Sequence, residues 1–163
     1  TGVITVLKNM GANISISNEK TVCGEYVADI HVKHSKLRGT TIGGKIIPTL
    51  IDEIPVLAVA AAFANGKTII KDARELKVKE SNRIKTVVCE LKKFGANIEE
   101  TDDGMVIIGK ENLSGARCES HNDHRIAMSM AVAALAAEGA SVIENKECVD
   151  ISFPEFFDYI ERL

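Results

Sequence analysis

Two alanine-rich stretches, residues 54–64 and 126–137, restrict the possible folds more than any other feature of the chain. Both have the length of a helix and are apolar nearly all round. A helix without a polar face has to be buried on every side. We therefore expect helices inside the domain and sheets outside them, the reverse of the usual layering in α/β proteins.

An internal repeat surrounds these two stretches. Gly-Ala-Asn occurs at residues 11–13 and at residues 95–97, each time between an apolar helical pattern and an alternating strand pattern. Residues 63–70 resemble residues 136–143 in the same way. Each unit is predicted to run helix, strand, strand, polar loop, buried helix and strand. Since the chain begins inside the first helix of a unit, we expect it to be a fragment that lacks the preceding strand.

Composition excludes several classes of protein. The 163 residues are 45% hydrophobic, which argues against disorder, and the formal net charge of −3 argues against a nucleic-acid partner. The longest apolar stretch is too short for a membrane span. Four cysteines without a CxxC pair indicate buried, reduced thiols and a cytoplasmic protein. Two HxxH pairs lack the further ligands of a zinc site, so we expect no metal.

A charged segment precedes the helix predicted to begin near Ile84. Lys79, Glu80 and Arg83 lie in this segment, and Gly95 follows the helix as a C-terminal cap. Helix N-termini favour anions, and an arginine there can hold a phosphate or carboxylate with two hydrogen bonds. The segment is therefore a candidate anion site. A solvated helix start is the alternative, because charge clusters are common there.

Three further helix starts carry residues with the chemistry of caps. Asp52 and Asp123 precede the two buried helices, where an aspartate commonly caps the helix. For Asp52 a bond to a ligand hydroxyl is the alternative. Ser152 and Glu155 have the spacing of a capping box, which predicts a short closing helix after Ser152.

Arg125 is harder to explain as a structural residue. It lies in the first turn of a buried helix, where a positive charge opposes the helix dipole at a cost of about 0.3–1 kcal/mol. Arg83 occupies the same unfavourable place on its own helix. Two arginines placed against a dipole favour an anionic ligand over a purely structural role.

Two strings identify a family that the chain resembles. Residues 76–83, Leu-Lys-Val-Lys-Glu-Ser-Asn-Arg, and residues 123–128, Asp-His-Arg-Ile-Ala-Met, resemble the paired motifs of the 5-enolpyruvylshikimate-3-phosphate synthases (3-phosphoshikimate 1-carboxyvinyltransferases). The similarity continues to the Ser-Phe-Pro-Glu-Phe-Phe string of residues 152–157. It implies an α/β fold of repeated βαβαββ-type units with buried parallel helices and outer sheets, an inside-out barrel. Residues 1–163 would form the C-terminal part of one domain, about two units, with the other domain absent.

The resemblance also implies an activity and its residues. The family transfers the enolpyruvyl group of phosphoenolpyruvate to the 5-hydroxyl of shikimate-3-phosphate. Asp52 matches the proton acceptor, which contacts the shikimate ring hydroxyl, and Glu80 matches the proton donor. Lys79 matches a contact to shikimate-3-phosphate. Arg83 and Arg125 match the two arginines that bind phosphoenolpyruvate, and no cofactor or metal is implied.

The chain departs from the family pattern at two positions. Glu75 stands where some members have a substrate-binding Asn, and Ile151 stands where many have a Lys. The family's N-terminal Lys-Ser pair, Ser-Ser-Gln segment and further Arg lie outside this chain. We therefore expect the chain to fold at least partly but to need the N-terminal part of the same enzyme as its partner for turnover.

Three alternatives remain from the sequence. The UDP-N-acetylglucosamine enolpyruvyl transferases share the fold and reaction but lack the Lys-Glu-Ser-Asn-Arg string. A non-catalytic packing or interaction module would not bind phosphoenolpyruvate. RNA 3′-phosphate cyclases use a similar repeated unit, but the acidic balance and the few aromatic residues disfavour a nucleic-acid ligand.

Overall fold

The structure, a computed structural model, describes residues 2–162 and contains the helices and strands that the repeat predicts, together with two short strands that it does not. The elements are α1 (Gly2–Asn9), β1 (Asn13–Val22), β2 (Glu25–Lys33), β3 (Thr41–Ile42), α2 (Ile54–Ala62), β4 (Lys67–Ile70), α3 (Arg83–Lys93), β5 (Asn97–Thr101), β6 (Gly104–Ile108), β7 (Arg117–Glu119), α4 (His124–Ala136), β8 (Val142–Glu144) and α5 (Phe156–Ile160). Short 3₁₀ helices span Gly44–Thr49, Ile51–Glu53, Arg74–Val78 and Lys146–Ile151. Within the described residues, no helix is long and apolar enough to span a membrane.

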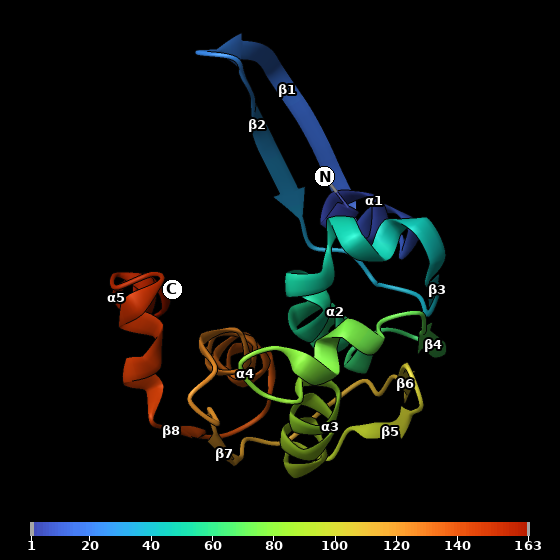
Figure 1. Cartoon of the computed structure of the whole chain (residues 1–163), viewed down its shortest axis with the longest axis vertical. Helices are drawn as coiled ribbons and strands as arrows, with labels where there is room; N and C mark the ends of the chain where they lie inside the picture. Colours follow the sequence, from blue (N-terminus) through green and yellow to red (C-terminus); the bar gives the residue numbers. More distant parts are fainter. Residues whose placement is uncertain (1, 163) are drawn as a thin grey trace.

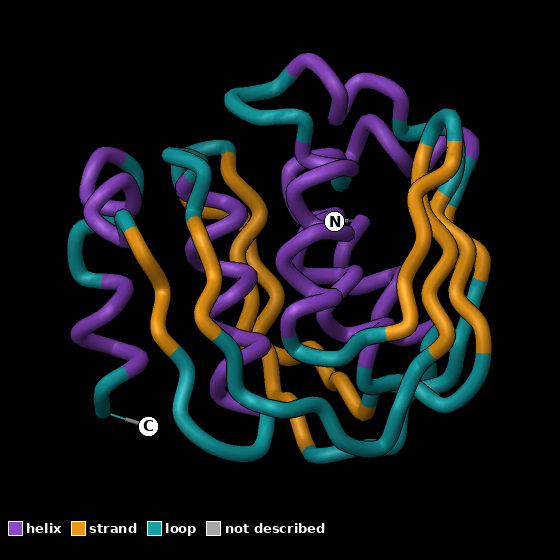
Figure 2. The backbone as a smooth tube through the Cα atoms, turned by 90° about the horizontal axis from the view of Figure 1, so that it is seen from below, coloured by secondary structure: helices purple, strands orange, loops and turns teal. Residues whose placement is uncertain are grey.

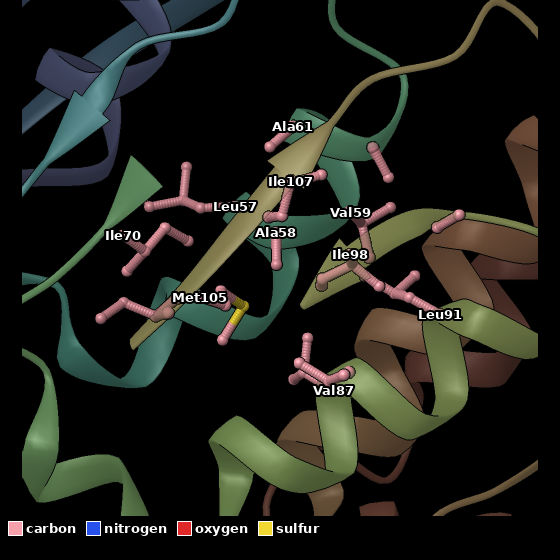
Figure 3. Packing of buried hydrophobic residues seen from close by; sticks show 14 of the residues in the cluster. Leu57, Ala58, Val59, Ala61, Ile70, Val87, Leu91, Ile98, Met105 and Ile107 are labelled. Carbon is pink, nitrogen blue, oxygen red and sulfur yellow. The ribbon is translucent and has the colours of Figure 1, made fainter. Parts of the chain in front are cut away.

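The central helices lie between two groups of strands, which confirms the predicted inversion of the layers, whereas α5 lies outside the strands beside the C-terminus (Figure 2). α2 is buried on nearly all sides, because its alanines allow close approach of neighbouring elements. Figure 3 shows Leu57, Ala58 and Ala61 of α2 packed beside Met105 and Ile107 of β6. Their exclusion from water contributes about 25 cal/mol for each Å² of apolar surface.

One complete βαβαββ unit is present, formed by β3, α2, β4, α3, β5 and β6. Its sheet has the order β3-β4-β6-β5, in which β3 and β4 are parallel and the hairpin β5–β6 joins β4 in antiparallel orientation. α1 and the hairpin β1–β2 before it correspond to α3 and β5–β6. The elements β7, α4 and β8 after it correspond to β3, α2 and β4. The prediction missed β3 and β7, because strands of two or three residues leave no alternating pattern.

The hairpin β1–β2 projects away from the body of the molecule and, within the described residues, pairs with no other strand (Figure 1). Aligning the two Gly-Ala-Asn strings and the two hairpin registers places Ile30 and Val32 at the positions of Met105 and Ile107. Met105 and Ile107 are 0% exposed, whereas Ile30 is 53% and Val32 is 68% exposed. The same apolar positions are thus covered in the complete sheet and uncovered in the hairpin.

Alanine at these paired positions is expected to have unequal effects on stability. Ile107→Ala removes buried methyl groups and leaves a cavity, which should lower the free energy of unfolding by about 2–5 kcal/mol. Val32→Ala, at the equivalent exposed position, should cost less than about 1 kcal/mol. Urea denaturation of the two variants measures the difference. Equal losses would mean that the hairpin is covered in solution.

Three details of the predicted fold are wrong. α4 is not buried on every side, because Leu135 in its last turn is exposed. The closing helix α5 begins after Glu155, and no side chain caps it, so the capping box at Ser152 does not form. Cys23 and Cys89 are exposed rather than buried. Gly95, by contrast, has the left-handed φ of +84° expected of a helix C-terminal cap.

Candidate functional site

Arg83 lies at the centre of the site and is almost completely buried. It is the first residue of α3, directly after the capping residue Asn82. Its Nε donates to Oδ2 of Asp123 at 2.8 Å, its Nη1 to Oδ1 of Asp52 at 2.8 Å and its Nη2 to Oε2 of Glu80 at 2.6 Å. A further bond from Nη2 reaches Oδ1 of Asp123 at 3.2 Å. The side chain is only 1% exposed, and its guanidinium binds three carboxylates. These bonds use four of its five N–H groups, which leaves one N–H on Nη1 for a further acceptor.

Asp123 has two roles in the structure. As predicted, it caps α4, because its Oδ1 accepts the backbone N–H of Arg125 at 3.0 Å. Its other oxygen accepts from Arg83 and from the hydroxyl of Ser81 at 2.9 Å. Burial acts to raise the pKa of Asp123, but the hydrogen bond and charge of Arg83 outweigh it and hold that pKa below its ordinary value. A fully buried carboxylate therefore fixes α3 to the start of α4.

Asp52 does not cap α2, contrary to the structural interpretation of its position. It lies in the 3₁₀ helix Ile51–Glu53, and Glu53 precedes α2 without a side-chain cap. The Asp52 carboxylate instead binds Arg83 and lies 3.5 Å from Nζ of Lys79. Desolvation acts to raise its pKa, but Lys79, Arg83 and Arg125 together lower it. Asp52 is thus a half-exposed carboxylate surrounded by cations.

The two remaining predicted cations also have carboxylate partners. Nζ of Lys79 lies 3.1 Å from Oε1 of Glu75, and this hydrogen bond is the main cause of a raised Lys79 pKa. Nη1 of Arg125 lies 3.6 Å from Oε1 of Glu53, and both side chains are about one-third exposed. Arg125 therefore has the longest of these ion pairs and an open side toward solvent.

All five predicted residues meet at one site, although they come from three separate parts of the chain. Sequence reasoning missed the contacts of Asp123, Ser81, Glu53 and Glu75 to these residues. Three cations face five carboxylates here, so the site carries no net positive charge. Among residues 2–162, no group of three His, Cys, Asp or Glu side chains is arranged to hold a metal ion.

Comparison with known protein families shows which proteins this chain is similar to. The family model described as EPSP synthase (3-phosphoshikimate 1-carboxyvinyltransferase) matches residues 1–160. The chain belongs to the EPSP synthase family. This confirms the resemblance found in residues 76–83 and 123–128.

Relatives from the EPSP synthase family match the entire chain. A 3-phosphoshikimate 1-carboxyvinyltransferase of Thermoanaerobacter sp. (strain X514) is 61% identical over 163 residues, and one of Gloeobacter violaceus is 53% identical over 163 residues. Each match covers 100% of this chain and 38% of the relative. The chain therefore spans little more than one-third of the length of these relatives.

Solved structures confirm the fold of the EPSP synthase family. An EPSP synthase from Acinetobacter baumannii superimposes with a TM-score of 0.95 at 42% identity, over 99% of this chain and 38% of that one. The enolpyruvyl transferase NikO from Streptomyces tendae superimposes with a TM-score of 0.73 at 20% identity, over 99% of this chain and 34% of that one. The second match shows the common fold alone.

Proposed function

We propose that this chain is part of an enzyme of aromatic amino acid biosynthesis. The enzyme transfers the enolpyruvyl group of phosphoenolpyruvate to the 5-hydroxyl of shikimate-3-phosphate and releases phosphate. Membership of the EPSP synthase family supports this reaction. The observation that carries it is the placement of two half-exposed carboxylates, Asp52 and Glu80, on two nitrogens of one buried guanidinium.

Asp52 and Glu80 divide two proton transfers between them in this proposal. The 5-hydroxyl of shikimate-3-phosphate has to lose a proton, and C3 of phosphoenolpyruvate has to gain one. Two carboxyl groups in different surroundings are suited to opposite roles. Asp52 lies among cations that favour its ionised form, which suits a proton acceptor. Glu80 extends from the same guanidinium toward solvent and is assigned as the donor.

The cations bind the anionic substrates. Arg125 is the best placed to hold phosphoenolpyruvate, because it is partly exposed and its ion pair with Glu53 is long. Arg83 contributes through its remaining N–H on Nη1, and Lys79 contacts shikimate-3-phosphate. Since carboxylates outnumber cations here, further positive groups have to come from outside this chain.

The rest of the enzyme is the proposed partner of this chain. Residues 1–163 form the C-terminal part of one domain, and the open edge of β2 with Ile30 and Val32 is where the remainder would complete the fold. The chain alone is then inactive. We place the enzyme in the cytoplasm, because the four cysteines of this chain are free thiols.

Replacing Arg125 with alanine tests the assignment of the phosphoenolpyruvate site. The assay uses this chain assembled with the remaining part of the Thermoanaerobacter relative, here called the assembled enzyme. Loss of a hydrogen-bonded charge should raise KM for phosphoenolpyruvate about 10–100-fold. Arg117→Ala is the matched control, since Arg117 is exposed and its ion-pair partner among residues 2–162 is Glu144. An unchanged KM in Arg125→Ala would remove this residue from the site.

A further inference from the structure

Glu90 is a buried carboxylate of α3 that the proposed reaction does not use. Its side chain is 0% exposed. Oε1 lies 2.8 Å from Nε2 of His121, and Oε2 accepts the backbone N–H of Glu119 at 2.8 Å. Nζ of Lys93, one turn along the same helix, donates to both oxygens at 2.9 and 2.7 Å. Glu90 thus joins α3 to the end of β7 and to the loop that follows it.

Glu90 and Arg83 lie seven residues apart, so they share one face of α3. Both bind the segment of residues 119–123, which leads from β7 into α4. Glu90 holds its beginning through Glu119 and His121, and Arg83 holds its end through Asp123. One helix face therefore fixes this segment at both ends.

The segment needs these contacts because two of its residues have an unfavourable backbone conformation. His121 and Asn122 have φ values of 55° and 54°, in the left-handed region that side chains disfavour. Consecutive residues of this kind persist only where the surroundings determine them. Ser120 adds contacts to the other side, where its hydroxyl donates to the carbonyl of Asn145 at 2.9 Å. Arg125 follows this strained pair after two intervening residues.

We propose that Glu90 is a positioning residue for phosphoenolpyruvate binding. By holding Glu119 and His121 it fixes residues 119–123, and this segment in turn sets the place from which Arg125 extends. The inference rests on the proposed function, in which Arg125 binds phosphoenolpyruvate. Glu90 itself is buried beneath the segment and touches no substrate.

The test compares Glu90→Met with Lys93→Met. Glu90→Met removes both contacts to the segment, whereas Lys93→Met removes the partner on α3 and leaves those contacts in place. In the assembled enzyme, Glu90→Met should raise KM for phosphoenolpyruvate about tenfold, as expected of a small displacement of a binding group, and leave KM for shikimate-3-phosphate within about twofold. Glu90→Gln keeps an acceptor for the Glu119 amide, so it should raise KM for phosphoenolpyruvate less than Glu90→Met does. Lys93→Met should change neither value.

Hydrogen exchange on this chain alone gives a second, independent measurement. Glu90→Met should speed exchange of the amides in residues 119–125 about tenfold, and Lys93→Met should not. If Glu90→Met does not fold, His121→Ala can replace it in this measurement, because His121 is partly exposed and contacts Glu90. Unchanged exchange, or faster exchange without a change in KM for phosphoenolpyruvate, would overturn the inference. An inactive wild-type assembly would count against the proposed function, and exchange would still decide whether Glu90 holds the segment.

Discussion

Arg83→Met is expected to lower the free energy of unfolding of this chain by about 3–5 kcal/mol, the usual cost of breaking a buried ion pair from one side. The variant leaves Asp123 fully buried without its positive partner. It also leaves Asp52 and Glu80 close together without the charge between them. Methionine has a similar length, so loss of charge and hydrogen bonds dominates the effect. Urea denaturation at neutral pH measures it.

Arg117→Met is the matched control for this experiment. Arg117 also pairs with a carboxylate, that of Glu144, but both side chains are exposed. Exposed pairs contribute about 0–1 kcal/mol. If both variants lost less than about 1 kcal/mol, Arg83 would not be the group that holds the three carboxylates together.

Glu80→Gln should lower kcat of the assembled enzyme by about 10²–10⁴-fold, the range for loss of a general acid or base. The amide keeps the size of the side chain and an oxygen for Arg83, so KM for both substrates should change little. A large fall in kcat with stable KM values would assign Glu80 to the chemical step. Steady-state rates of phosphate release measure both constants.

Glu75→Gln is the control for this second variant. Glu75 pairs with Lys79 at the edge of the same site but is not one of the three carboxylates that bind Arg83. Its kcat should stay within about threefold of the wild-type value. An equal fall in kcat for Glu75→Gln and Glu80→Gln would indicate a general electrostatic effect of the segment.

The sequence predicted the fold well where patterns were long. The apolar helix at residues 54–64, the stripe of Ile84, Val87 and Leu91, and the two Gly-Ala-Asn strings located α2, α3 and the hairpins. These patterns depend on burial over several turns, which the chain records residue by residue. β3 and β7 were missed because two or three residues are too few to show alternation. The false capping box shows that spacing alone does not make a cap.

The structure brings the five predicted site residues together, but the sequence did not predict the contacts between them. Position at a helix start singled out Asp52 and Arg83, and the family resemblance added Glu80. The burial of Arg83 among three carboxylates depends on how α3 packs against α4, which no local pattern records. Asp123 was predicted as a cap only, because its second partner lies 40 residues away. Long-range ion pairs of this kind require the folded structure.

Phosphate release from shikimate-3-phosphate and phosphoenolpyruvate is the most direct test of the proposed reaction. It should be measured with this chain alone, with the remaining part of the Thermoanaerobacter relative alone, and with the two assembled. We expect release only from the assembly, and we expect Arg125→Ala to reduce it. An assembly that forms but releases no phosphate would contradict the assignment and would favour the UDP-N-acetylglucosamine enolpyruvyl transferase reaction instead.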